Sequence, residues 1–463
     1  MNAVATPSTA TDTRTALKFI TCGSVDDGKS TLIGRLLVDS KAVLQDHLAG
    51  VQRQGETDLA LLTDGLSAER EQGITIDVAY RYFNTETRKF IIGDAPGHEQ
   101  YTRNMVTAAS AADAAVVLVD ATKLDWKDAS LKLLPQTRRH ALLLQLLRVP
   151  SIVFAVNKLD AVADSALAFA HIGAALAAFA AKAGIAVTTT VPVSALKGWN
   201  VVDAPAHAGW CGYHGPTLLA ILEHLPVTRP DSALPLAFPV QWVEKPGAPI
   251  RPAAPGSLPP VGADAPGGGP APHPASSPSD ARQGRRVFWG RVATGSVHPG
   301  QAIKVMPSGQ SATVAQVLNH VRHPLAVSAG HSAGIVLDRE IDVSRGDWLL
   351  AVDEQGQSLE TSREIRATVA WLDDEPLVAG RVYWALHGHR WVKAKVRRIV
   401  HQLDVHTLAE ENATQLEPNA IGHIELSLQE PLATAPFAHS RTLGSLVLVD
   451  TTSHRTSGAV LVH

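Results

Sequence analysis

Nine consecutive residues near the start of the chain have the types and spacing of a phosphate-binding loop. They are Gly23, Ser24, Val25, Asp26, Asp27, Gly28, Lys29, Ser30 and Thr31, which fit the pattern G-x-x-x-x-G-K-[ST]. The two glycines let backbone N–H groups approach phosphate oxygens, and a helix N-terminus adds its dipole. Lys29 would act catalytically on the β- and γ-phosphates, and the Ser30 hydroxyl could complete the ligand shell of Mg²⁺.

The residues on either side of this loop predict the strand and the helix that the motif requires. Residues 17–22 form an apolar run typical of a buried strand, and residues 31–37 carry apolar side chains at helical spacing. A strand, a glycine-rich turn and a helix in this order distinguish a phosphate loop from an accidental match. Cys22, at the end of the strand, is interpreted as a small buried residue rather than a redox-sensitive thiol.

Two further segments could respond to the terminal phosphate of a nucleotide. The first is a D-x-x-G loop made of Asp94, Ala95, Pro96, Gly97 and His98. Asp94 would reach Mg²⁺ through water, and the Gly97 N–H would contact the γ-phosphate. Thr75, upstream, could bind Mg²⁺ and the γ-phosphate only while the third phosphate is present, so its segment is predicted to be a switch. Ser30, Thr75 and Asp94 are therefore the expected metal-binding residues.

A third group of residues, each following an apolar run, would select the base. These residues are Asn157, Lys158, Leu159 and Asp160, followed later by Ser194, Ala195 and Leu196. The Asp160 carboxylate can accept from both N1–H and the 2-amino group of guanine, a donor pair that adenine lacks. Such mismatches cost roughly 10³–10⁵ in discrimination, and the Ala195 N–H can face guanine O6. Five elements in this order favour GTP over the alternative, an unrelated ATP-binding α/β domain.

The pattern of apolar runs divides the chain into three domains. Six expected strands alternate with helical segments at residues 19–22, 78–83, 90–93, 114–120, 152–156 and 187–193. This alternation predicts an α/β domain with a mostly parallel sheet over residues 17–227. Short runs separated by turn residues then predict two all-β barrels, over residues 228–357 and 358–463.

Two segments are expected to be disordered. Residues 1–16 are rich in Thr, Ser and Ala, without the basic start or apolar core of a signal peptide, so we expect a tail. Residues 246–284 are nearly half Pro or Gly and cannot bury much apolar surface. The runs that flank this insertion, residues 238–243 and 286–292, resemble the two arms of a hairpin.

The composition limits which partners and which cell compartment are expected. A net charge of −3 gives no electrostatic reason to expect nucleic acid or a membrane as an obligatory partner. Two distant cysteines, Cys22 and Cys211, exclude a disulfide framework and favour a cytoplasmic setting. The apolar run 166–181 contains His171 and is too short for a membrane span, so it predicts a surface helix. Twenty histidines show no consistent ligand spacing, and His387-Gly388-His389 is interpreted as a hairpin turn.

The GTP motifs followed by two barrels resemble the translational GTPases, the class of elongation factor Tu. Within that class, the sequence most resembles the GTP-binding large subunit of the heterodimeric bacterial-type sulfate adenylyltransferase. The segments that carry this closer resemblance are residues 23–30, 64–83, 97–105, 290–300, 342–347 and 419–422. It covers nearly the whole chain from Leu17 onward, apart from the insertion.

The resemblance implies that GTP hydrolysis is coupled to adenylyl transfer from ATP to sulfate, which a separate small catalytic subunit performs. It also implies a catalytic role for His98, which would orient the attacking water, while Val25 and Ile74 would gate the approach of that water. A residue matching Asp26 is associated with a monovalent cation in some relatives. The chain has no second phosphate loop, so the fused adenylylsulfate kinase of some relatives is not expected.

The sequence departs from the family at three places. Ala95 stands where Thr is usual and should touch no phosphate, residues 125–135 look like an added loop, and the Pro/Gly insertion is the third departure. The competing interpretation is an elongation factor that carries aminoacyl-tRNA, which would share the fold and the GTP chemistry. An inactive scaffold is disfavoured by the intact set Lys29, Thr75, Asp94 and His98.

Overall fold

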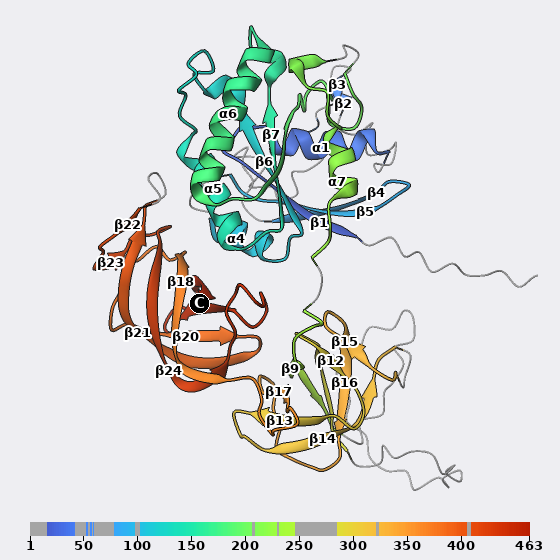
Figure 1. Cartoon of the computed structure of the whole chain (residues 1–463), viewed down its shortest axis with the longest axis vertical. Coiled ribbons are helices and arrows are strands. Elements are labelled where there is room, and N and C mark those ends of the chain that lie inside the picture. The colour runs from blue at the N-terminus through green and yellow to red at the C-terminus, as the bar shows by residue number, and fades with distance from the viewer. Residues whose placement is uncertain are drawn as a thin grey trace, which may run out of the picture.

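The chain folds into three parts, each built on its own sheet (Figure 1). The computed structural model describes residues 16–41, 52–53, 56–57, 59, 78–97, 102–205, 209–228, 231–245, 285–320, 324–404 and 409–463. The predicted tail up to residue 15 and the predicted insertion 246–284 lie outside these ranges. So do Thr75 and His98, two residues expected at the nucleotide site.

The first part is a six-stranded sheet in the order β4-β5-β1-β6-β7-β8. Its strands are β1 (Leu17–Cys22), β4 (Ala79–Asn84), β5 (Lys89–Asp94), β6 (Ala114–Asp120), β7 (Ser151–Asn157) and β8 (Val187–Pro192). Within this sheet β4 pairs antiparallel with β5, and every other pair is parallel. The predicted mostly parallel sheet is therefore confirmed, with each of the six predicted strands placed to within two residues.

Helices cover both faces of this sheet, because alternate side chains of its central strands point to opposite sides. They are α1 (Lys29–Asp39), α4 (Thr102–Ser110), α5 (Pro135–Leu146), α6 (Ser165–Ala183) and α7 (Leu218–His224). Val116 and Leu118 of β6 pack with α1 and α7, whereas Val117 and Val119 pack with α4, α5 and α6. Short elements complete this part: β2 (Gln52–Arg53), β3 (Glu56–Thr57), η3 (Ala121–Lys123), η4 (Leu159–Ala161) and η5 (Trp210–Gly212).

Helix α6 is the apolar segment for which a surface helix was predicted. It begins after Asp164, whose carboxylate accepts from the Leu167 N–H, and ends at Gly184 in the left-handed conformation. Its length and composition alone would allow a membrane span. However, Ile172 and Leu176 are fully buried in the core beside the sheet, so the helix packs as a covering element of the first part.

The second part is a seven-stranded sheet in the order β10-β11-β16-β14-β13-β17-β9. Its strands are β9 (Ala237–Pro239), β10 (Trp242–Glu244), β11 (Val287–Arg291), β13 (Ala302–Met306), β14 (Ser311–Leu318), β16 (Ser332–Leu337) and β17 (Trp348–Ala351), with β12 (Ser296–Val297) and β15 (Val327–Ser328) paired separately. The predicted hairpin arm 238–243 is split at Val240 and Gln241, where the chain changes partner: the Val240 N–H donates to the Asp347 carbonyl, and the Gln241 N–H donates to the Trp289 carbonyl. β9 therefore pairs with β17 and β10 with β11, so consecutive strands lie at opposite ends of the sheet order.

The third part is a seven-stranded sheet in the order β20-β25-β26-β18-β24-β21-β22, closed into a barrel by a further pairing of β20 with β21. Its strands are β18 (Thr361–Trp371), β20 (Val382–His387), β21 (Arg390–Leu403), β22 (Glu410–Glu411), β24 (Ile421–Ala433), β25 (Ser445–Asp450) and β26 (Thr456–Val462), with β19 (Leu377–Val378) and β23 (Gln415–Leu416) paired separately. Gly388 and His389 form the turn between β20 and β21, so the predicted hairpin turn is confirmed.

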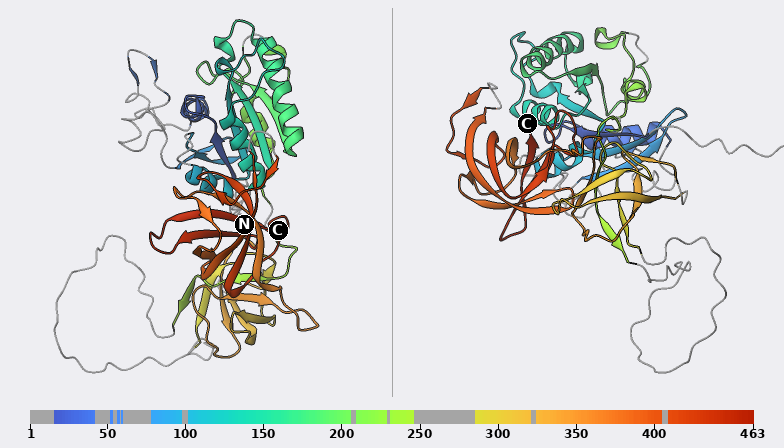
Figure 2. Two further views of the ribbon diagram at one scale, coloured as in Figure 1. Left: turned by 90° about the vertical axis from the view of Figure 1, so that its left-hand side faces the viewer. Right: turned by 60° about the horizontal axis from the view of Figure 1, so that its bottom comes forward.

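The two barrels contact each other closely, as both views in Figure 2 show. The Trp348 ring of the second part stacks on His387 of the third, with ring centroids 4.8 Å apart. Burial lowers the pKa of His387 to about 4, so this imidazole is neutral at physiological pH. Arg390 donates to Asp347 at 2.8 Å and also pairs with Glu430. Aromatic stacking and ion pairing thus join the barrels.

The third part also contacts the first, below α4 and α5 in Figure 1. Arg139 of α5 donates to the Asn419 carbonyl at 2.9 Å, and Arg441 donates to the carbonyls of Leu147 and Arg148 at 2.8 and 2.7 Å. Ile421 shares an apolar cluster with residues of the first part. The start and the end of α5 are therefore both tied to the third part.

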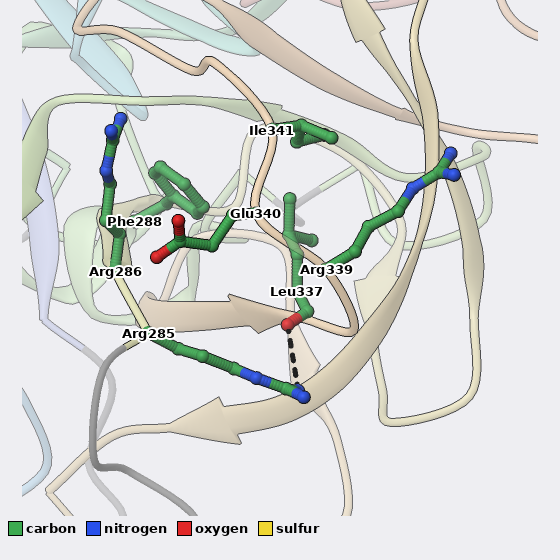
Figure 3. A pocket seen from close by; sticks show the side chains of 7 residues that line it. All are labelled: Arg285, Arg286, Phe288, Leu337, Arg339, Glu340 and Ile341. Atoms are coloured by element: carbon green, nitrogen blue, oxygen red, sulfur yellow. Dashed lines mark hydrogen bonds between the residues drawn. The ribbon is translucent and has the colours of Figure 1, made fainter.

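A small hollow opens in the second part near the start of β11 (Figure 3). The residues that line it are Arg285, Arg286, Phe288, Leu337, Arg339, Glu340 and Ile341. Arg285 reaches across it to donate to the Leu337 carbonyl at 3.3 Å. Its volume of about 10 Å³ admits roughly one water molecule. It is therefore too small for a nucleotide.

Candidate guanine nucleotide site

The phosphate loop connects β1 to α1 at the carboxyl end of the sheet, where α/β sheets bind ligands. Gly28 has φ 93° and directly precedes α1, and a Cβ there would lie 2.4 Å from the Asn157 amide nitrogen. This position therefore requires glycine. The Asp27 carboxylate accepts from the Ser24 N–H at 2.6 Å and from Lys123 Nζ at 2.9 Å. These bonds fix the curvature of the loop.

Lys29 is folded inside this loop. Its Nζ donates to the carbonyls of Gly23 and Ser24 at 3.1 and 2.8 Å, and the residue is 7% exposed. Burial lowers its pKa, while the nearby carboxylates of Asp94 and Asp27 oppose that shift. The ammonium is thus held by loop carbonyls at the place where the motif needs a cation for phosphates.

Asp94 ends β5 beside the loop and is 3% exposed. Its register partner on β1 is Thr21, whose hydroxyl donates to the Asp94 carboxylate at 3.3 Å. Ser30 lies in the first turn of α1. Hydroxyl and carboxylate oxygens are the donors that Mg²⁺ prefers, so Ser30 and Asp94 fit the predicted metal role.

Gly97 lies directly against the phosphate loop. A Cβ at this position would lie 2.4 Å from Lys29 Nζ and 2.8 Å from the Gly23 carbonyl oxygen, so only glycine fits. The Gly97 carbonyl accepts from the Gln136 side-chain amide at 3.1 Å. The structure thus brings the D-x-x-G loop into contact with Lys29 and with the first turn of α5.

The Gln136 amide nitrogen also lies 3.0 Å from His140 Nε2. An amide nitrogen only donates, so His140 Nε2 accepts and its hydrogen resides on Nδ1. Burial, together with the positive charges of Lys29 and Arg139, lowers the pKa of His140 to about 3. The imidazole is therefore neutral and can act as a fixed acceptor that orients Gln136 toward Gly97.

The residues expected at the base are linked to the phosphate loop by side chains. Asn157 Nδ2 donates to the Asp27 carbonyl at 2.8 Å, and Lys158 Nζ donates to the Asp26 carbonyl at 2.6 Å. Lys158 also pairs with the buried Asp120 carboxylate at 2.7 Å. Although burial raises the pKa of Asp120, its hydrogen bonds from Lys158 and Thr122 outweigh that effect and lower the pKa.

Asp160 is half-buried in η4 and makes no side-chain hydrogen bond within the part of the chain that the structure describes. Its carboxylate is thus available to a ligand. The Ala195 N–H donates to Asn157 Oδ1 at 3.0 Å, so the predicted contact with guanine O6 would have to share that N–H. Arg35 of α1 donates to the carbonyls of Ala195 and Leu196 at 3.2 and 2.5 Å, which fixes this loop.

The structure therefore brings four of the five predicted segments together. They contain Gly23 to Thr31, Asp94 to Gly97, Asn157 to Asp160, and Ser194 to Leu196. Thr75 and His98, expected as catalytic and switch residues, lie outside the described residues, as does Ile74. Their roles stay predictions. Cys22 is fully buried and burial raises the pKa of its thiol to about 12, which confirms its interpretation as a core residue.

Comparison with known proteins places the chain in a family. Residues 14–227 match the Elongation factor Tu GTP binding domain, and residues 364–463 match the GTP-eEF1A C-terminal domain-like family. The chain is 41% identical over 458 residues to the sulfate adenylyltransferase subunit 1 of Citrobacter koseri, covering 97% of this chain and 86% of that protein. The chain belongs to the sulfate adenylyltransferase subunit 1 family.

Longer proteins are related to this family as well. The bifunctional enzyme CysN/CysC of Xylella fastidiosa is 44% identical over 451 residues, which are 96% of this chain but 65% of that protein. The chain thus spans less than two thirds of that relative. A solved structure of sup35 complexed with GDP aligns with 20% identity and a TM-score of 0.39, over 99% of this chain and 96% of that one.

Several residues around this family's GTP site were missed by reasoning from the sequence. They are Thr21, Arg35, Asp120, Lys123, Gln136 and His140. Most of them act by holding a loop backbone rather than by matching a motif. Gln136 carried one usable signal, because it follows a proline that can begin a helix after β6. The other five residues could be recognised only by knowing which loops meet at the carboxyl edge of the sheet.

Proposed function

We propose that this chain is the GTPase subunit of a sulfate adenylyltransferase. Its GTP hydrolysis would drive the synthesis of adenosine 5′-phosphosulfate from ATP and sulfate on a separate small catalytic subunit. The observation that carries this proposal is the 41% identity to a sulfate adenylyltransferase subunit 1 over 97% of this chain, which includes both barrels. An elongation factor that carries aminoacyl-tRNA is disfavoured, because the relatives from Citrobacter koseri and Salmonella typhi, each covered to 86% of its length, are named sulfate adenylyltransferase subunit 1.

In this proposal each loop of the site has one task. Asp160 binds guanine, Lys29 binds the β- and γ-phosphates, and the backbone N–H groups of the phosphate loop surround the phosphate oxygens. Ser30 and Asp94, with Thr75, would hold Mg²⁺, which when bound neutralises charge on the β- and γ-phosphate oxygens. His98 would orient the attacking water. It directly follows Gly97, whose carbonyl accepts a hydrogen bond from Gln136.

The same contacts suggest how the bound nucleotide could change the affinity of this chain for a partner. Gln136 in the first turn of α5 holds Gly97, and Arg139, three residues later, donates to Asn419 of the third part. One helix therefore touches both the γ-phosphate sensor and a barrel. A small subunit that binds better to the GTP-ordered state would, by linkage, stabilise that state in return.

A cytoplasmic heterodimer is the setting that we propose for this activity. Cys22 and Cys211 are both free and buried, in keeping with a reduced compartment. We assign no role to nucleic acid or to a membrane, since a net charge of −3 offers no general attraction to either.

Reconstitution with the small catalytic subunit tests the proposal. GTP hydrolysis and adenylylsulfate formation are measured together, with the chain alone and with ribosomes as controls. We expect GTP turnover to rise with the small subunit and adenylylsulfate yield to exceed that obtained with a non-hydrolysable GTP analogue. Equal yields with the analogue would leave only a scaffold role, and stimulation by ribosomes instead would restore the elongation-factor interpretation.

A further inference from the structure

A row of polar side chains crosses the third part away from the nucleotide site. His401 of β21 and His423 of β24 are direct partners across the antiparallel pair. In such a pair the two side chains lie on one face with their Cβ atoms about 4.5–5.5 Å apart. Glu410 of the edge strand β22 pairs with Leu403, two residues beyond His401. The strands β22, β21 and β24 are neighbours in the sheet (Figure 1), and each carries one side chain of a type that can ligate a metal ion.

The distances between these groups are short. One ligand atom from each of His401, Glu410 and His423 lies within 4.8 Å of the others. His401 Nε2 and Glu410 Oε1 are 3.3 Å apart. Two ligands at about 2.1 Å from a tetrahedral ion are themselves roughly 3.4 Å apart. The His401–Glu410 pair therefore already has the separation of two ligands on one metal ion.

The surroundings favour ligation over simple hydrogen bonding. His401 Nε2 is buried and has no partner of hydrogen-bond geometry among the described residues, although Glu410 is close. The rings of His401 and His423 lie 4.3 Å apart, and the His463 ring packs edge-on against His423 at 4.8 Å.

From this arrangement we propose that His401, Glu410 and His423 form a binding site for a divalent transition-metal ion, with Zn²⁺ as the best fit. Two imidazoles and one carboxylate are a donor set that Zn²⁺ uses, with water in the fourth position. Mg²⁺ and Ca²⁺ are disfavoured, because they prefer all-oxygen ligands. The ion would tie β22, a two-residue edge strand, to the two strands beside it.

An ion at this location would affect the contact between the third part and the first part. Leu403 and Ile421 are register partners two residues from the His401–His423 pair. Both pack with the apolar cluster of the first part. A metal ion at this edge would therefore fix the strands that carry part of the contact between the third part and the GTPase part.

Zinc titration of the untagged full-length chain tests this site. The protein is stripped with a chelator and titrated with Zn²⁺ against a chromogenic competitor, with Mg²⁺ in large excess so that Ser30 and Asp94 cannot contribute. We expect one equivalent of Zn²⁺ per chain and a Zn²⁺-dependent rise in melting temperature, because binding to the native state alone stabilises it. Co²⁺ should give the visible spectrum of a tetrahedral site.

Three variants and a matched control decide the assignment. His401→Ala and His423→Ala should each weaken Zn²⁺ binding by more than about 100-fold, beyond the 10–100-fold that loss of an outer-shell partner costs. Glu410→Gln, an exposed and nearly isosteric change, should weaken it without risk to folding. His439→Ala, at an exposed histidine of the same part, should leave it unchanged. The proposal fails if the wild type binds no better than the His401→Ala/His423→Ala double variant, or if His439→Ala loses binding equally.

Discussion

The two ends of the nucleotide site are built differently. At the base end, Asn157 and Lys158 hold the phosphate loop by hydrogen bonds, and Asn157 also accepts from Ala195. At the γ-phosphate end, the described residues supply Lys29, Asp94 and Gly97, and the Gly97 carbonyl accepts from Gln136 of α5. Thr75 and His98 lie outside the described residues.

This difference suits the two tasks of the site, which are to select the base and to sense the γ-phosphate. A base pocket that discriminates by hydrogen bonds works best when its groups are fixed before the ligand arrives, because unpaired polar groups then penalise the wrong base. A γ-phosphate sensor must instead have two arrangements whose balance the ligand can shift. Substitutions at the base end should therefore change which nucleotide binds, and those at the γ-phosphate end should change turnover.

The largest effect is expected at the base end. Asp160→Asn places an amide donor where the carboxylate offered only acceptors, so it should favour xanthine, which carries a carbonyl in place of the guanine amine. GTP binding should weaken by roughly 10³-fold or more, and XTP should become the preferred nucleotide. Competition binding with GTP and XTP measures this. An unchanged preference for GTP would remove Asp160 from the base site.

A substitution at the γ-phosphate end should slow GTP hydrolysis without changing which nucleotide binds. His98→Ala is expected to leave nucleotide affinity near normal and to slow GTP hydrolysis by roughly 10²–10⁴, the range for losing a positioned proton-transfer or water-orienting group. Single-turnover hydrolysis and equilibrium binding separate the two quantities. If affinity falls as much as turnover, His98 has a structural role and the division between the two ends is not valid.

The sequence predicted the elements of this site better than the contacts between them. Four of the five motif segments lie at or just after the ends of β1, β5, β7 and β8, so the order of strands and loops could be predicted from apolar runs and glycine positions. The tertiary contacts were not predictable, since Gln136, Arg35 and Lys123 act on backbone groups that become neighbours only after folding. The histidines of the third part show the same limit. His401 and His423 lie 22 positions apart in sequence, and it is strand pairing that brings them together.

A smaller effect is expected where α5 meets the γ-phosphate end. Gln136→Leu preserves size but removes the donor to the Gly97 carbonyl, and one such bond contributes about 0.5–1.5 kcal/mol. GTP hydrolysis should slow by up to about tenfold while GDP affinity stays constant. Gln145→Leu is the matched control, because Gln145 on the same helix donates to the Gly184 carbonyl at 2.8 Å, away from the nucleotide. Equal effects of the two substitutions would show that only helix stability is being measured.

The last effect is on stability rather than on turnover, and it concerns His140, which accepts from Gln136. The pKa of His140 is about 3 in the folded chain, against about 6.5 for an unperturbed histidine. Between these values the unfolded chain binds the proton and the folded chain does not, so stability falls as pH drops below about 6.5. By pH 5 this group alone should remove roughly 2 kcal/mol of the stability present at neutral pH.

His140→Gln, which cannot take up that proton, should therefore show a shallower decline of melting temperature between pH 7 and pH 5. His224→Gln, at an exposed histidine on α7, provides the control slope. If His140→Gln declines as steeply as the wild type, His140 is not buried as a neutral group, and the γ-phosphate end lacks the fixed acceptor that orients Gln136.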